Sequence, residues 1–129
     1  MKIIIKSKNF ELTAQLESFI NKKIGGLTKF LKAFEGHSLP VAGGRSLFDT
    51  FVEVERETMH HRKGDIFKAE AKIYLPGKSL FAKAHGEDLM KAINEVRDEL
   101  EGEIRKYKAK VIEFPRRKRK KESNEVFLG

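Results

Sequence analysis

Residues 66–85 read IFKAEAKIYLPGKSLFAKAH and carry the clearest structural signal in the chain. From Phe67 to Leu75, apolar and small side chains alternate with charged ones, which is the two-residue period of a β-strand. Pro76-Gly77 predicts a tight turn, because proline fixes φ and glycine accepts a positive φ. The alternation resumes over residues 79–85. The stretch therefore predicts a β-hairpin with one packed face and one wet face.

Two more strands are predicted upstream of this hairpin. Residues 50–57 alternate with Val52 and Val54 inward, and residues 2–8 surround three isoleucines. Between these two strands, residues 35–48 form a long loop with Gly, Ser and Pro. A loop of this length is either mobile or functional, and the sequence leaves both readings open.

Two stretches have apolar residues at three- and four-residue spacing, which predicts amphipathic helices over residues 11–34 and 87–108. Thr13 is a candidate for the start of the first helix. Gly25 and Gly26 lie inside it, and because glycine disfavours helix by about 1 kcal/mol relative to alanine, we expect a weak or bent turn there.

The resulting order, β-α-β-β-β-α, predicts an α+β fold. Two amphipathic helices can cover one face of a four-stranded sheet. The sheet is expected to be mixed, because a strand–helix–strand unit makes a parallel pair and hairpins make antiparallel pairs. Residues 1–110 are expected to form this single domain. Residues 111–129 are expected to be a disordered, basic C-terminal tail.

The composition narrows the class of protein. The 129 residues include no cysteine, so disulfides and thiolate chemistry are excluded. No apolar run approaches the roughly 18 residues of a membrane span, and the start MKIIIKSKNF is too short in apolar residues for a signal peptide. We therefore expect a soluble cytoplasmic protein with no membrane partner.

The net charge of +8 predicts a polyanionic partner, because bound cations release the counterions of a polyanion. The charge is uneven along the chain. Residues 110–129 hold seven basic and three acidic residues, which is half of the net excess. The alternative reading of this tail is a solvated segment that only aids solubility.

Catalytic chemistry is hard to place in this sequence. It contains no phosphate-binding glycine loop, dinucleotide fingerprint or nucleophile elbow. His60 and His61 are adjacent, so in an extended segment they point to opposite sides and do not chelate a metal. We expect no enzyme activity, metal, cofactor or small-molecule substrate. A nuclease using these histidines and the strand glutamates remains the enzymatic alternative.

Basic residues recur along the wet flanks of both predicted helices. At about 100° per residue, Arg97, Arg105 and Lys108 share one flank of the second helix, and Asp98 and Glu101 dilute it. Spread lysines and arginines suit the repeating phosphates of an RNA backbone. The candidate RNA-binding residues are Lys22, Lys23, Lys29, Lys32, Arg62, Lys63, Lys91, Arg97, Arg105, Lys106, Lys108, Arg116, Arg117, Lys118 and Arg119. Ordinary surface charge would explain any one of them.

The open face of the predicted sheet has a mixed charge pattern and lacks the aromatic signature of sheet-type RNA readers. Its charged residues are Glu53, Glu55, Lys68, Glu70, Lys72 and Lys83. We therefore expect RNA contact through helices and loops.

These residues also resemble a known family. The run KGDIFKAEAKIYLPGKSLFAKAHGEDLMKAINEVRDELEGEIRKYK (63–108) is similar to the ribosome hibernation promoting factors. That family includes the ribosome-associated translation inhibitors, also called ribosomal subunit interface proteins. KSKNFELT (6–13) and INKKIGGLTKF (20–30) look like its first strand and helix. The resemblance covers about residues 2–110.

The resemblance implies a β-α-β-β-β-α fold similar to double-stranded-RNA-binding domains. It also implies binding to small-subunit ribosomal RNA in the channel of messenger and transfer RNA, which silences or stores ribosomes. Such a protein is expected to be monomeric when free. The family often has a basic residue where this chain has Gly26, Glu99 and Gly102. The chain resembles the family's short forms, because residues 111–129 are too few for a second domain.

Two non-enzymatic alternatives accompany this expectation. One is a general RNA-binding module, such as an assembly factor or RNA chaperone, which competition with transfer RNA on the small subunit would distinguish. The other is a protein-binding domain whose basic charge meets an acidic partner.

Overall fold

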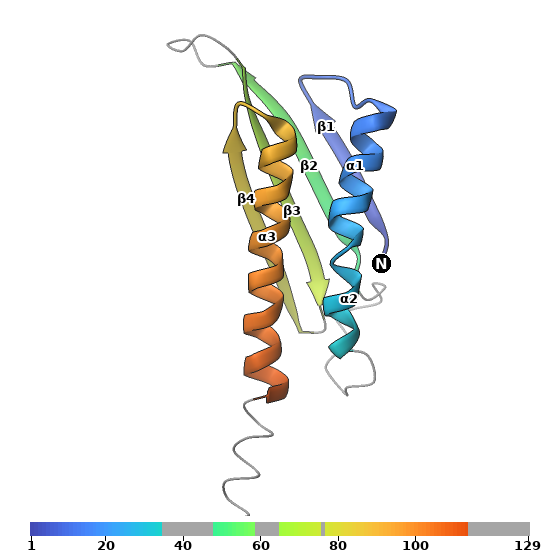
Figure 1. The fold of residues 1–129 in the computed structure, drawn as a ribbon, viewed down its shortest axis with the longest axis vertical. Helices are drawn as coiled ribbons and strands as arrows, with labels where there is room; N and C mark the ends of the chain where they lie inside the picture. Colours follow the sequence, from blue (N-terminus) through green and yellow to red (C-terminus); the bar gives the residue numbers. More distant parts are fainter. Residues whose placement is uncertain (35–47, 59–64, 76, 114–129) are drawn as a thin grey trace, which may run out of the picture.

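The computed structural model describes residues 1–34, 48–58, 65–75 and 77–113, with one sheet backed by a layer of helices (Figure 1). The first half contains β1 (Ile3–Lys8), α1 (Ala14–Gly25), α2 (Thr28–Leu31) and a 3-10 turn, η1 (Lys32–Phe34). The second half contains β2 (Thr50–Thr58), β3 (Asp65–Leu75), β4 (Lys78–Gly86), α3 (Leu89–Lys108) and a π-helical turn, η2 (Ala109–Glu113).

The strands form one four-stranded sheet in the order β1-β2-β3-β4. β1 runs parallel to β2, with Ile3 opposite Thr50, and the two later pairs are antiparallel. α1, α2 and α3 lie on the same side of this sheet (Figure 1). The predicted α+β class and the mixed sheet with helices on one face are confirmed.

The core lies between the sheet and the two helical segments. The inward residues of β3 and β4 are small, and Ala69, Ala71 and Ala82 are at most 1% exposed. Their short side chains leave room for the larger residues of the helices, such as Ile93 and Leu100 of α3. The fully buried large residues from α1, α2, the turn between them and η1 are Ile20, Ile24, Leu27, Leu31 and Phe34. The burial of these residues fixes how the helices lie against the sheet.

The first helix begins at Ala14 and is interrupted, as its two glycines predict. The Leu16 amide donates to Thr13 Oγ1 at 3.2 Å, which confirms Thr13 as the N-terminal cap. α1 ends at Gly25, and the chain turns before α2 begins at Thr28. The Thr28 hydroxyl donates to the Gly25 carbonyl at 2.7 Å and satisfies one of the free carbonyls of the helix end.

α3 begins at Leu89, where the Met90 amide donates to the carboxylate of Asp88 at 2.9 Å. The chain stays helical through Glu113, past the predicted domain boundary at residue 110, and Ile112 is buried in the core. The predicted tail from residue 114 onward lies outside the described residues. Gly77 has φ 75°, which suits the predicted turn, and Pro76 lies outside the described residues. No helix in the described part of the chain is long and apolar enough to cross a membrane.

Candidate nucleic-acid interface

A basic groove runs along the seam between α1–α2 and α3. Two hollows make up this groove, and Lys29 lines both. The cations that line it are Lys22, Lys23 and Lys29 from α1 and α2, and Arg97, Arg105 and Lys108 from α3. α1 and α2 therefore supply one bank of the groove and α3 the other.

Phe30 lies at the centre of the groove and holds cations from both banks near its ring. Its ring centroid is 5.1 Å from Lys29 Nζ, 5.8 Å from Arg97 Cζ and 5.3 Å from Arg105 Cζ. Cations are attracted to the negative face of an aromatic ring. The half-buried Phe30 side chain thus gathers three positive charges that would otherwise repel one another.

The two banks differ in how far their charge is neutralised. Arg97 lies 3.1 Å from Asp98 and 3.5 Å from Glu101, and Arg105 lies 3.5 Å from the other oxygen of Glu101. Among the described residues, no carboxylate lies within 4 Å of the ammonium groups of the three lysines on the other bank, Lys22, Lys23 and Lys29. The cations of the α1–α2 bank are therefore more available to a polyanion, because carboxylates neutralise them less.

The structure brings together six of the predicted site residues and separates others. Lys32, Lys91 and Lys106 are exposed but line neither hollow, and Lys106 lies 3.6 Å from Glu103. The remaining predicted residues, Arg62, Lys63, Arg116, Arg117, Lys118 and Arg119, lie outside the described residues. Which of these residues contact RNA stays a prediction.

Sequence reasoning missed Phe30, because an aromatic residue at helical spacing looks like an ordinary core residue. Asn94 and Gly26 also line the groove. Gly26 is the more informative of the two, because it has no side chain that could place a charge in the groove. The groove therefore has a gap in its charge between Lys22 and Lys29.

The sequence matches a known protein family over most of its length. Residues 3–112 match the family described as sigma 54 modulation protein / S30EA ribosomal protein, which is most of the chain. The chain belongs to the S30EA ribosomal protein family.

Two ribosome hibernation promotion factors resemble the chain over most of its length. It is 29% identical over 111 residues to the ribosome hibernation promotion factor of Bacillus subtilis, covering 86% of this chain and 50% of that protein. It is 26% identical over 118 residues to the factor of the same name from Lactococcus lactis, covering 90% and 54%. The chain thus spans about half the length of the curated relatives it matches.

Two solved structures share the fold. A ribosomal subunit interface protein from Coxiella burnetii superposes with a TM-score of 0.62 at 18% identity, covering 84% of this chain and 99% of that one. The N-terminal domain of Protein Y from Thermus thermophilus gives 0.58 at 19% identity, covering 83% and 99%. At these identities the likeness concerns the fold alone.

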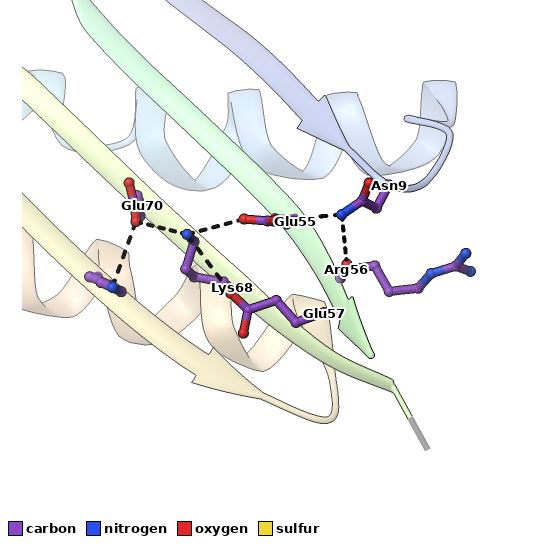
Figure 2. A network of polar contacts seen from close by, with 7 residues as sticks. Asn9, Glu55, Arg56, Glu57, Lys68 and Glu70 are labelled. Atoms are coloured by element: carbon purple, nitrogen blue, oxygen red, sulfur yellow. Dashed lines mark hydrogen bonds and ion pairs between the residues drawn. The ribbon is translucent and has the colours of Figure 1, made fainter. Parts of the chain in front are cut away.

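The other face of this S30EA sheet, turned away from the helices, has a charged end (Figure 2). Lys68 Nζ lies 3.1 Å from Glu55, 3.3 Å from Glu70 and 3.9 Å from Glu57. The hydrogen bond to Glu55 raises the pKa of Lys68 above 10.5, and the hydrogen bond to Glu70 and the charges of both carboxylates add to it against some desolvation. No group of three His, Cys, Asp or Glu in the described part of the chain could hold a metal.

The opposite end of the same face carries exposed aromatic side chains, and the expectation that this face lacks the aromatic signature of sheet-type RNA readers stays a prediction. Phe51 and Phe81 are 40% and 53% exposed, and Tyr74 meets Phe51 edge-on at 5.7 Å between centroids. The physical reason for this exposure is the two-residue strand period, which turns Phe51 outward when Val52 turns inward.

Proposed function

We propose that the chain is a ribosome hibernation factor that binds small-subunit ribosomal RNA in the channel of messenger and transfer RNA. Bound there, it silences or stores ribosomes in the cytoplasm. The observation that carries the proposal is the basic groove, whose Lys22, Lys23 and Lys29 have no carboxylate partner among the described residues. The names of the curated relatives support the ribosomal role.

The groove suits RNA through its length and its charge. Arg97 and Lys108 are separated by eleven residues of helix, which is about 16 Å at 1.5 Å per residue. A row of cations of this length can follow several phosphates of one strand, and each contact releases counterions. Such binding requires no chemical step, so occupancy of the channel is the mechanism and the protein acts as a binding factor without catalysis.

The first prediction concerns the unpaired bank of the groove. Changing Lys22, Lys23 and Lys29 together to Gln should weaken binding to small subunits. The slope of log K against log salt should fall by roughly two to three, since about 0.7–0.9 counterions are released per phosphate contact. Co-sedimentation with purified small subunits across a salt series, with transfer RNA as competitor, measures both effects.

The matched control removes the same charge from outside the groove. Lys2→Gln, Lys8→Gln and Lys110→Gln change exposed residues in and beside β1 and in η2 that line neither hollow and are not among the candidate RNA-binding residues. This triple variant should lose markedly less affinity. Equal losses would show that overall basicity drives binding and would contradict the groove. Binding that transfer RNA does not displace would favour a general RNA-binding module.

A further inference from the structure

A row of four directly opposite residues crosses the solvent-facing side of the sheet. Ile4 lies opposite Phe51, Phe51 opposite Lys72, and Lys72 opposite Phe81. Ile4, Phe51 and Phe81 are 39%, 40% and 53% exposed. Three of the five exposed large apolar residues of the described chain therefore gather in one row, on the face opposite the basic groove.

This row borders a hollow of about 410 Å³, within the range of roughly 300–1,000 Å³ typical of small-ligand sites. Ile4, Phe51 and Phe81 supply its apolar surface. Lys6 and Lys72 contribute cations to the lining, and Glu53 and Glu70 contribute carboxylates. The hollow is thus apolar between the rings and charged around them.

The two lysines of this hollow are free to meet an anion. Neither Lys6 nor Lys72 has a carboxylate within 4 Å among the described residues. Glu70 is already engaged by Lys68 at 3.3 Å. Lys72 Nζ lies 5.1 Å from the centroid of the Tyr74 ring, and Tyr74 in turn supports Phe51 at 90° between planes. Lys72, Tyr74 and Phe51 are therefore already in contact before any ligand arrives.

We propose that this hollow binds an unpaired base of single-stranded RNA, stacked on Phe81, with its phosphates near Lys6 and Lys72. Flat bases stack on exposed aromatic rings without regard to sequence, and neighbouring cations hold the backbone. The site lies on the opposite side of the sheet from the basic groove, so the proposal does not depend on the function assigned to that groove.

The charge pattern beside the row disfavours a second copy of the chain as the occupant. The adjacent row across the sheet is Lys6, Glu53, Glu70 and Lys83. Two such faces packed about a two-fold axis parallel to the strands would place Lys6 against Lys83 and Glu53 against Glu70. Like charges brought together in this way oppose association.

Glu53 gives the site a base preference. No ion-pair or hydrogen-bond partner of its carboxylate lies among the described residues, and it lines the hollow beside Lys6. A carboxylate accepts hydrogen bonds from exocyclic amino groups, such as N4 of cytosine. Uracil has no amino group, and its one Watson–Crick donor, N3–H, lies between two carbonyl oxygens that repel a carboxylate. Oligocytidylate should therefore bind more tightly than oligouridylate of the same length.

The experiment uses the full chain carrying Tyr107→Phe, which leaves Tyr74 as the single tyrosine. Labelled hexamers of oligocytidylate and oligouridylate are titrated by fluorescence anisotropy, and Tyr74 emission is followed in parallel. Phe81→Ser should weaken oligocytidylate binding by about five- to a hundredfold, as expected for loss of one stacked base. It should also remove the preference for cytosine and the change in Tyr74 emission.

Two controls separate this site from others. Met90→Ser removes another exposed apolar side chain, on α3, and should bind like the parent. The triple variant of Lys22, Lys23 and Lys29 should bind less tightly overall yet keep the cytosine preference. The proposal is overturned if Phe81→Ser binds both hexamers as the parent does. It is also overturned if sedimentation shows a dimer of the parent that Phe81→Ser dissociates, because the face would then hold a second copy.

Discussion

At the level of single residues, Lys68 lies among three carboxylates on the open face of the sheet. The Lys68 ammonium group contacts carboxylates from both β2 and β3 (Figure 2). The Lys68 side chain is only 18% exposed. Glu55 also accepts from the Asn9 amide at 3.4 Å, which connects the end of β1 to the same cluster. Without the lysine, three glutamates would face one another across two strands, and like charges on neighbouring positions destabilise a sheet.

Lys68→Met should therefore lower the free energy of unfolding. The folded protein raises the pKa of Lys68 above its ordinary 10.5, so the stabilisation is fully present below that pH and is lost as pH rises through the folded pKa. The difference between parent and variant in urea unfolding should stay constant up to about pH 10 and narrow beyond it. Lys72→Met, on the same strand and face, serves as control and should change the free energy of unfolding only slightly, because no carboxylate among the described residues lies within 4 Å of Lys72. A difference that grows above pH 10.5 would contradict this assignment.

At the level of elements, the interrupted first helix was the best predicted feature. Gly25 and Gly26 marked the break, and Thr13 marked the start, because both act through local backbone chemistry that a sequence displays directly. The exact ends of the helices were harder to predict from the sequence. Residues 11–13 have apolar spacing compatible with helix, yet the chain enters α1 only at Ala14, after the cap that Thr13 provides.

Gly26→Lys should strengthen binding to small subunits. Gly26 has φ −61°, which any residue adopts, and a Cβ there would lie 3.4 Å from the Lys22 and Lys23 carbonyl oxygens. The new cation would fill the gap between Lys22 and Lys29 and should steepen the salt slope by roughly 0.7–0.9. Gln15→Lys is the matched control, because it adds the same charge at an exposed position of α1 outside both hollows. Equal gains from both variants would speak against the groove.

At the level of the whole molecule, the helical side and the sheet side present different chemistry. Helical periodicity predicted that Arg97, Arg105 and Lys108 share a flank, and they do line the groove. The approach of Phe30 to that flank could not be predicted, since it depends on how α2 packs against α3. The aromatic row could not be predicted either. The two-residue period of a strand turns Phe51 and Phe81 outward, but only the register of all four strands brings them into one row.

The basic tail gives a prediction at the same scale. We propose that residues 115–121, PRRKRKK, contact RNA phosphates and compensate for the positions where the helices lack charge. Changing Arg116, Arg117, Lys118 and Arg119 to Gln keeps the chain length and should weaken small-subunit binding. The salt slope should fall by up to roughly 3.6, for four lost contacts at about 0.7–0.9 each. An unchanged slope in the salt series would assign the tail to solubility instead.

The parallel pairing of β1 with β2 also affects how the chain reaches its fold. Ile3 and Thr50 are 47 positions apart, whereas β2, β3, β4 and α3 follow one another through short connections. Closing a long loop is entropically unfavourable and slows folding, so we expect the antiparallel strands and α3 to assemble before β1 joins them. During synthesis, β1 leaves the ribosome before its partner exists. Its isoleucines must then remain unpaired until residues 50–55 have followed, which is more than a third of the chain, and β1 becomes the last of the four strands to be secured.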